Sequence, residues 1–325
     1  MFLFTLAIII GFALLVWSAD KFVDGAASTA KYLGMPSLLI GVLIVGFGTS
    51  TPEMVVSAIA AINGNSGLAL GNAIGSNIVN IALILGITAI ITPISVHSKI
   101  VKKELPILTL IVLIVGYMLI DNSLTFFEGF LLICAFFSLI GWSIYSAIKD
   151  RKNSLTSDIE EGLKEHSISL KSGFIWLGVG LILLILSSRV LVWGAIGIAH
   201  EFGVSDLIIG LTIVAFGTSL PELASSVIAA KKGEHDIALG NIVGSNMFNM
   251  LAVIGIATVI TPMQNIPTEA LYRDWSVMFL LTVILFVMTY KFNSKERGVI
   301  SRVMGVVLLL CYIWYNSYLT TTLVS

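Results

Sequence analysis

One apolar segment occurs twice in this chain, and each copy carries a single glutamate. The stretch GFGTSTPEMVVSAIAAINGNSGLALGNAIGSNIVN ends at Asn80, and AFGTSLPELASSVIAAKKGEHDIALGNIVGSNMFN ends at Asn249. The glutamates, Glu53 and Glu222, are separated by the same interval of 169 residues as these two asparagines, so the copies align without a gap. About half of the positions in 41–93 are identical to those in 210–262, which chance composition does not produce. The chain is therefore built from two related halves.

Apolar residues dominate the whole chain, not only the repeat. They make up 57% of the residues, against 11% that are charged, and apolar runs recur with short polar breaks between them. This pattern excludes an ordinary soluble domain and predicts a polytopic membrane protein. The first run is interpreted as a retained span, because no small-residue cleavage site follows it. Ten spans are predicted, at 2–18, 37–62, 68–91, 104–120, 126–148, 172–193, 206–231, 236–260, 272–290 and 299–319.

The basic residues fall unequally on the two sides of such a bundle. Ten spans place both termini on one side of the membrane. Nearly every Lys and Arg then lies in a loop after an odd-numbered span, and only Arg189 and Arg273 fall on the other side. The positive-inside rule therefore places those loops, including 149–171, in the cytoplasm and both termini outside. We expect the chain in the inner (plasma) membrane of the cell.

The polar stretch 149–171 is predicted to be a cytoplasmic linker between two halves, 1–148 and 172–325. Each half contains five spans and one copy of the motif, at 41–93 and 210–262. Because five is an odd number, the second half enters the membrane from the opposite side. The predicted fold is all-α, with ten transmembrane helices in two inverted five-helix repeats, as in many secondary transporters. A duplication kept only for packing is the alternative, but packing does not require an acid in both copies.

Each motif interrupts its helix just before the glutamate. Pro52 cannot donate a hydrogen bond to the carbonyl of Gly48, and Ser or Thr followed by Pro and Glu is typical of a helix start. We predict two half-helices with a break at the midplane of the membrane. Carbonyl oxygens released by such a break need protein, water or an ion as partners. The C-terminal end of the first half-helix also favours a cation.

Glu53 is predicted to lie deep in the membrane. It precedes the end of its span by about nine residues, or roughly 13 Å, in a hydrocarbon core about 30 Å thick. An ionised side chain costs about 2.5–3.5 kcal/mol there on insertion scales. A bound cation or a proton could compensate this cost, since neither GTSTPE nor GTSLPE contains a basic residue.

The span after each glutamate supplies further oxygen atoms. Two sets of polar residues recur every four positions and therefore each share one helix face: Asn72, Ser76 and Asn80, and Asn241, Ser245 and Asn249. Glycine pairs in the same spans favour close helix packing: Gly71 with Gly75, and Gly240 with Gly244. For Asn77 and Asn246, a local hydrogen bond within the bundle and a contact to the ion both remain open.

The candidate ligands are all hard oxygens, which select Ca²⁺, Na⁺ or H⁺. The four histidines lie at span ends or in loops, and Cys134 and Cys311 are far from the motifs in the sequence, so a zinc or copper site is not predicted. Nothing marks a nucleophile or a substrate pocket. We therefore predict neither an enzymatic activity nor a resident cofactor.

The paired motifs GTSTPE with GNAIGSNIVN and GTSLPE with GNIVGSNMFN resemble the two alpha-repeats of the calcium/cation antiporters, and the compact prokaryotic sodium/calcium exchangers above all. The likeness covers nearly the whole chain. It implies a central cation site in which Glu53, Glu222, Thr49 and Thr218 bind Ca²⁺. The other cation ligands that it implies are Ser50, Ser219, Ser76, Ser245, Asn80 and Asn249, with the backbone carbonyls of Gly46 and Ala215. Asn249 stands where potassium-dependent members carry aspartate, which argues against potassium dependence.

These observations predict a secondary antiporter that exchanges Ca²⁺ for Na⁺ by alternating access around Glu53 and Glu222. Its partners are the lipid bilayer and small cations, with no nucleic acid, and the paired repeat within one chain predicts function as a monomer. Exchange of Ca²⁺ for H⁺ on the same scaffold is the first alternative, since a glutamate also takes a proton. A cation channel is a weaker alternative, because a channel usually needs a symmetric oligomer.

Overall fold

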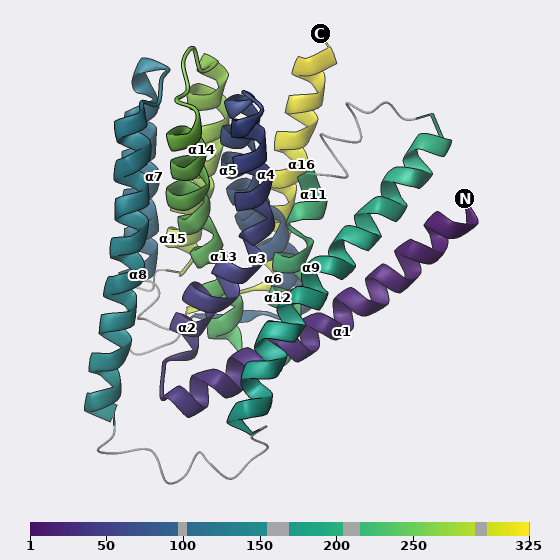
Figure 1. The fold of residues 1–325 in the computed structure, drawn as a ribbon, viewed down its shortest axis with the longest axis vertical. Coiled ribbons are helices and arrows are strands. Elements are labelled where there is room, and N and C mark those ends of the chain that lie inside the picture. Colours follow the sequence, from purple (N-terminus) through teal and green to yellow (C-terminus); the bar gives the residue numbers. More distant parts are fainter. Residues whose placement is uncertain (97–102, 155–168, 204–214, 290–297, 325) are drawn as a thin grey trace.

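A computed structural model describes the chain except for residues 97–102, 155–168, 204–214, 290–297 and 325. The described chain is a bundle of helices with one long helix pair crossing it at an angle (Figure 1). The helices of the first half are α1 (Phe2–Leu33), α2 (Ser37–Ile40), η1 (Gly41–Gly46), α3 (Phe47–Thr49), α4 (Thr51–Ile62), α5 (Ser66–Ile78), η2 (Val79–Ile84), α6 (Leu85–Ile91), α7 (Leu105–Met118), η4 (Leu119–Asp121) and α8 (Phe126–Ser154). Those of the second half are α9 (Leu170–Glu201), α11 (Ala215–Thr218), α12 (Leu220–Lys231), α13 (His235–Phe248), η7 (Asn249–Val253), α14 (Ile254–Ile260), η8 (Ala270–Trp275), α15 (Ser276–Thr289) and α16 (Arg302–Val324).

The helices follow the predicted spans, although α1, α8 and α9 are longer than predicted. Seven described helices are long and apolar enough to cross a membrane, or eight if the bent pair Ser37–Thr49 and Thr51–Ile62 is one span. The first predicted span ends at residue 18, whereas α1 continues to Leu33, with Ser28 and Thr29 buried in its extension. The start of the predicted seventh span and most of the predicted linker lie outside the described residues. The count of ten spans therefore stays a prediction.

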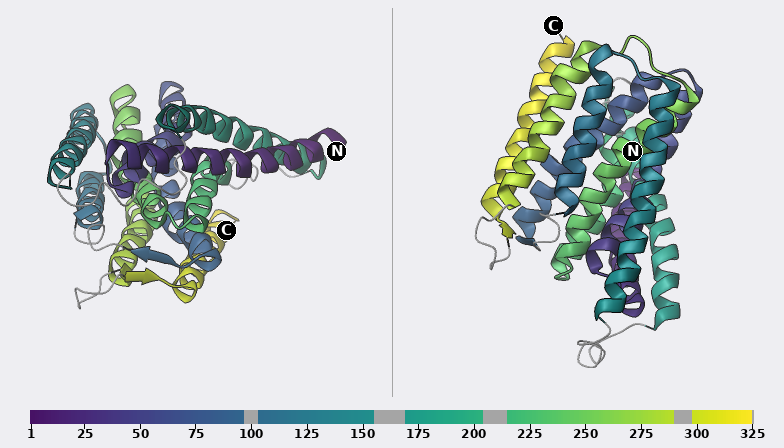
Figure 2. Two further views of the ribbon diagram at one scale, coloured as in Figure 1. Left: turned by 90° about the horizontal axis from the view of Figure 1, so that it is seen from below. Right: turned by 90° about the vertical axis from the view of Figure 1, so that its left-hand side faces the viewer.

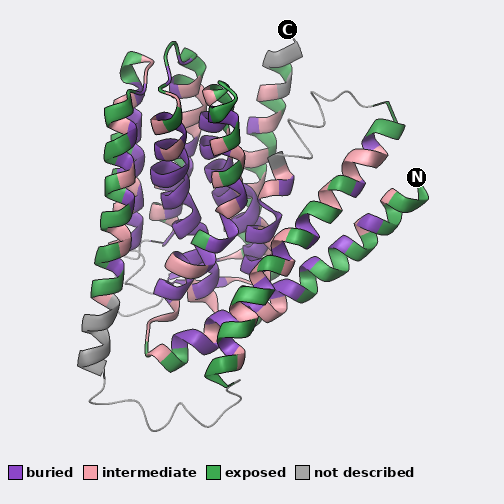
Figure 3. Cartoon of the chain, viewed as in Figure 1, coloured by how far each residue is buried: buried purple, intermediate pink, exposed green. Residues whose placement is uncertain are grey.

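Helices α1 and α9 form an antiparallel pair that extends away from the bundle at the N-terminal end of α1 (Figure 1). The pair is held by small residues at the contact. A Cβ atom added to Gly180 would lie 2.9 Å from the backbone of Phe22, closer than side chains normally approach. Most of the outer surface of the two helices is apolar and exposed (Figure 3), as expected for helices that face lipid.

The buried core lies in the middle of the bundle around α13, η7 and α14 (Figure 3). Two glycines let α13 approach α2 and η1. A Cβ atom on Gly244 would lie 2.7 Å from the carbonyl oxygen of Val42, and one on Gly240 would lie 2.8 Å from that of Leu38. This is the close packing that the sequence predicts for the second glycine pair. For the first pair, Gly71 and Gly75, no described atom lies within 4 Å of an added Cβ.

The described chain also contains a short β-ribbon, which the all-α prediction did not include. β1 (Ile94–Val96) pairs antiparallel with β2 (Gly298–Ile300), so that Ile94 is opposite Ile300 (Figure 2, left). Both ends of β1 are buried, as is Ile300. Alternate burial of apolar residues favours a strand over another helical turn at this place.

One charged contact joins α1 to the residue that follows α12. The Lys232 ammonium lies 2.7 Å from Asp20 Oδ1 and 2.7 Å from Asp24 Oδ1. It also donates to the carbonyl of Asp20 at 2.9 Å. Asp20 and Asp24, which follow the first apolar run, therefore form ion pairs rather than facing solvent alone.

Replacing Lys232 by methionine should lower the thermal stability of the purified chain modestly. Partly exposed ion pairs contribute about 0.2–1 kcal/mol each, and salt screens them. We expect a fall in melting temperature of a few degrees in dilute buffer that shrinks at high salt. Lys231→Met is the matched control, because Lys231 has no ion pair among the described residues. An equal effect of both substitutions at every salt concentration would contradict the pairing.

Candidate functional site

The helix is broken at the equivalent serine in both copies of the motif. Ser50 separates α3 from α4 with φ −80° and ψ 1°, and the two helical segments meet at a bend of 43°. Ser219 separates α11 from α12 with φ −92° and ψ 6°. Pro52 and Pro221 each lie in the first turn of the following helix, where the missing N–H has no helical partner to lose. The break predicted before each glutamate is present.

The breaks bring the two glutamates together. Glu53 and Glu222 are each only 1% exposed. Their contacts cross between the copies: Ser50 Oγ donates to Glu222 Oε1 at 3.3 Å, and Ser219 Oγ donates to Glu53 Oε1 at 3.5 Å. The two motifs, far apart in the sequence, therefore form one buried cluster.

Four buried oxygen atoms of this cluster have no hydrogen-bond donor among the described residues. They are Glu53 Oε2, Glu222 Oε2, Asn80 Oδ1 and Asn249 Oδ1. Buried oxygens are almost always paired, because an unpaired one loses its hydration without compensation. No Lys, Arg or His of the described chain forms an ion pair with either glutamate. The cluster thus contains one oxygen of each carboxylate and two amide oxygens that have no donor in the part of the chain that the structure describes.

Asn80 and Asn249 lie where the helices after the break widen into π turns. Asn80 belongs to η2, and Asn249 begins η7. Wide turns of this kind are rare and concentrate at functional sites. The sequence spacing alone predicts a continuous α-helix through both residues and gives no signal for the wider turns.

The threonines of the implied ligand set are also at the cluster. Thr49 is fully buried, and its single hydroxyl proton has two acceptors in reach, the Val45 carbonyl at 3.0 Å and Asn241 Oδ1 at 3.0 Å. Thr218 ends α11 beside Glu53 and is half-buried. The two implied Ca²⁺-binding threonines are therefore near the glutamates.

The remaining implied ligands are one serine each in α5 and α13 and two backbone carbonyls beside the breaks. Ser76 and Ser245 are both buried, and Ser245 Oγ donates to the Gly46 carbonyl at 3.3 Å. This carbonyl also accepts from the backbone N–H of Ser50 at 3.1 Å. The break therefore does not leave the Gly46 carbonyl without partners. Ala215 begins α11 at the equivalent place in the second copy.

Asn72 and Asn241 share a helix face with the implied ligands, but their side-chain amides donate hydrogen bonds to the backbone. Asn72 Nδ2 donates to the Glu53 carbonyl at 3.3 Å and to Ser57 Oγ at 2.9 Å. Asn241 Nδ2 donates to the Glu222 carbonyl at 3.2 Å. Each amide thus ties the start of a glutamate-bearing helix to the next helix. The sequence shows only the regular spacing of these asparagines, not that they donate to the backbone.

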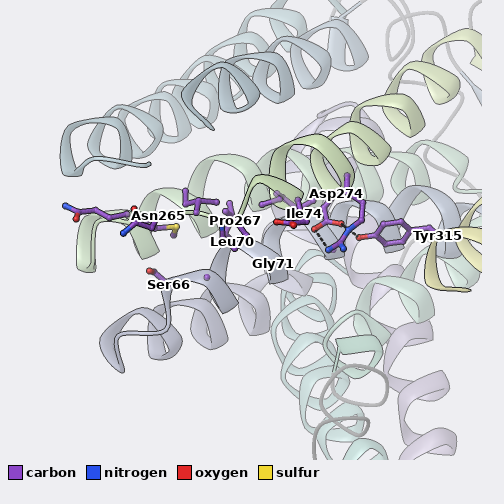
Figure 4. Close-up of a pocket in the computed structure, with 16 residues that line it drawn as sticks. Ser66, Leu70, Gly71, Ile74, Asn265, Pro267, Asp274 and Tyr315 are labelled. Carbon is purple, nitrogen blue, oxygen red and sulfur yellow. Dashed lines mark hydrogen bonds and ion pairs between the residues drawn. The ribbon is translucent and has the colours of Figure 1, made fainter. Parts of the chain in front are cut away.

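A cavity of about 330 Å³ lies away from this cluster, between α5, the segment after α14, and η8 (Figure 4). Arg273 pairs with Asp274 there at 2.7 Å, and the Tyr315 hydroxyl donates to Asp274 at 2.9 Å. No glutamate or asparagine of the cluster lines this cavity. The cluster therefore does not line this cavity.

Comparison with known proteins places the chain in a family. The family model described as sodium/calcium exchanger protein matches residues 3–145 and 172–321. The putative antiporter CaxA of Alkalimonas amylolytica is 44% identical, with 96% of this chain and 97% of that protein covered. The inner membrane protein YrbG of Escherichia coli (strain K12) is 39% identical, with 92% of this chain and 93% of that protein covered.

A solved structure agrees with this placement. The sodium-calcium exchanger NCX_Mj, in crystals soaked without Na⁺ and Ca²⁺, superimposes with a TM-score of 0.83 at 30% sequence identity. The match covers 98% of this chain and 99% of that one. The chain therefore belongs to the sodium/calcium exchanger family of membrane cation antiporters.

Proposed function

We propose that this chain exchanges Ca²⁺ for Na⁺ at a single central site built on Glu53 and Glu222. The observation that carries the proposal is the set of four buried oxygens without protein donors, two of them carboxylate and two amide. Hard oxygen ligands of this kind suit Ca²⁺ and Na⁺. A cation held there would supply the partner that each oxygen lacks. The names of the relatives support the same pair of ions.

The two carboxylates would bind the ion from opposite copies of the motif. Ser50 and Ser219 each donate a hydrogen bond to the glutamate of the other copy. An ion held by one glutamate would therefore also lie near the serine of the other copy. Thr49, Thr218, Ser76 and Ser245 would complete the hydroxyl part of the site, with Gly46 and Ala215 as carbonyl ligands. We infer that Asn80 and Asn249 contribute their free amide oxygens.

Coupling follows from the charge of the site. Occupied by one Ca²⁺, or by several Na⁺ ions whose summed charge matches it, the two carboxylates are compensated and the site can turn from one side of the membrane to the other. Empty, it carries uncompensated charge in an apolar environment, which costs several kcal/mol. The empty site therefore resists reorientation, and one ion leaves only in exchange for another.

We further propose that ten spans form two inverted repeats, with 149–171 in the cytoplasm and both termini outside. The distribution of basic residues supports this orientation. The crossing contacts between Ser50 and Glu222, and between Ser219 and Glu53, support a two-fold relation of the copies, because they are equivalent under exchange. The odd number of spans in each half makes this relation inverted. In secondary transporters, inverted repeats place two broken helices at the midplane of the membrane, one entering from each leaflet.

Separate ion gradients across reconstituted vesicles test the coupling ion. The purified chain is placed in vesicles loaded with Na⁺, and ⁴⁵Ca²⁺ uptake is measured after dilution into Na⁺-free buffer at equal pH. We expect rapid uptake that collapses when both sides hold equal Na⁺. A pH gradient without Na⁺ should drive no uptake. Uptake driven by the pH gradient alone would assign H⁺ as the coupling ion, and current without counter-ion would indicate a channel.

A further inference from the structure

Four buried asparagines bond across the two copies of the motif, where η2 contacts the Glu222-bearing helix α12 and η7 contacts the Glu53-bearing helix α4. Asn80 Nδ2 donates to Asn246 Oδ1 at 3.0 Å, and Asn249 Nδ2 donates to Asn77 Oδ1 at 3.1 Å. The two bonds are equivalent, because Asn246 lies 169 residues after Asn77, which is also the interval between Asn80 and Asn249. All four side chains are 1% exposed.

These bonds decide which end of each ligand amide faces the cluster. A carboxamide has an NH₂ group that only donates and an oxygen that only accepts. Because Asn80 donates an N–H to Asn246 and Asn249 donates an N–H to Asn77, the amide oxygens of Asn80 and Asn249 are the atoms left without a partner. With the amides reversed, N–H groups would face the carboxylates and the ion, and a cation would be repelled.

The orientation of one pair is set by the backbone. Asn77 Nδ2 donates to the carbonyl of Asn246 at 3.2 Å. A carbonyl can only accept, so the Asn77 amide cannot reverse without losing this bond. Its oxygen is then held toward Asn249, and the Asn249 oxygen is directed away from Asn77. The other pair lacks such an anchor, since Asn246 Nδ2 has no acceptor among the described residues.

We propose that Asn77 and Asn246 are positioning residues that hold the amides of Asn249 and Asn80 with their oxygens toward the transported cation. This inference rests on the proposed function, because it takes Asn80 and Asn249 as cation ligands. Neither Asn77 nor Asn246 touches the ion in this arrangement. Asn77 is itself anchored by the backbone carbonyl of Asn246, whereas Asn246 holds the Asn80 amide through the side-chain hydrogen bond alone.

Paired substitutions separate positioning from packing. Leucine at position 77 or 246 fills the space but accepts no hydrogen bond. An aspartate at position 249 or 80 offers oxygen in either orientation and needs no partner to turn it. Asn77→Leu should therefore weaken Ca²⁺ binding in the native background but not in the Asn249→Asp background. Asn80→Asp is the control background, because Asn80 is not bonded to Asn77. In that background, Asn77→Leu should lose as much Ca²⁺ affinity as it does in the native chain.

The measurement is Ca²⁺ affinity of the purified full chain, by calorimetry, together with its melting temperature. We expect Asn77→Leu to weaken affinity about tenfold in the native and Asn80→Asp backgrounds, and less than about threefold in the Asn249→Asp background. Asn246→Leu should show the reverse dependence, with its loss relieved only by Asn80→Asp. Equal losses in all backgrounds, or no loss in the native background, would overturn the proposal.

A second variant covers the case in which an aspartate background does not bind Ca²⁺. Asn77→Asp keeps an acceptor for the Asn249 amide, whereas Asn77→Leu does not. Asn77→Asp should bind Ca²⁺ at least about threefold more tightly than Asn77→Leu. Equal affinities would contradict a positioning role. Failure of the proposed function is seen separately, because the unsubstituted chain would then neither bind Ca²⁺ nor exchange it for Na⁺.

Discussion

Glu53→Gln should reduce Na⁺-dependent Ca²⁺ uptake by at least about 100-fold. Removing one member of a buried charged pair costs on the order of 3–5 kcal/mol, which corresponds to a factor of this size or greater in binding. Here the pair is the glutamate and the cation that it is proposed to hold. Glutamine has nearly the same shape as glutamate, so the melting temperature of the ion-free chain should not fall. Glu222→Gln should give the same result, since the two residues have equivalent contacts.

The measurement is ⁴⁵Ca²⁺ uptake into vesicles that contain equal amounts of each folded variant. Glu128→Gln is the control, because Glu128 lies at the start of α8, where it accepts from the backbone N–H of Thr125 at 2.8 Å. That variant should transport at the normal rate. Near-normal uptake by both Glu53→Gln and Glu222→Gln would rule out the two-glutamate site.

Gly244→Val should destabilise the chain and remove transport together. A Cβ atom on Gly244 would lie 2.7 Å from the Val42 carbonyl and 2.8 Å from its Cα, and backbone cannot move aside as a flexible side chain can. Overpacking of this kind typically costs about 1–3 kcal/mol or more. Separation of α13 from η1 would also break the bond from Ser245 to the Gly46 carbonyl. We expect a melting temperature lowered by several degrees and loss of uptake.

Gly75→Val provides the matched control for this effect. Gly75 is the equivalent glycine of the first copy, and no described atom lies within 4 Å of an added Cβ there. The melting temperature of this variant, measured by size-exclusion chromatography of heated samples, should change little. A normal melting temperature for Gly244→Val, or an equal fall for both variants, would contradict the packing described between α13 and η1.

Local chemistry explains why much of the site is predictable. Pro52 lacks an N–H, and so the helix must break where the sequence places it, whatever surrounds it. Glu53 and Glu222 stand out because an acid in an apolar run needs compensation. Family membership also follows from the residues, since both motifs are highly specific. These features depend on residue type and on neighbours a few positions away.

Other features depend on partners that are distant in the sequence. The continuation of α1 past Asp20 is stabilised by Lys232, and the spacing near Asp20 gives no hint of that partner. The β-ribbon joins Ile94 to Ile300 in the same way. The wide turns at Asn80 and Asn249 lie within buried helices, and the regular spacing of the sequence gives no sign of them.

The sequence by itself determined that this chain has two equivalent halves, each with one buried acid, a broken helix and a face of oxygen-bearing side chains. Only the tertiary structure decided how the halves use these groups. Ser50 donates a hydrogen bond to the glutamate of the other copy, and Asn80 bonds to Asn246. The physical reason is that a hydrogen bond depends on the positions and orientations of two groups in space. A repeat in the sequence states which groups exist, and only packing sets which of their atoms remain free for an ion.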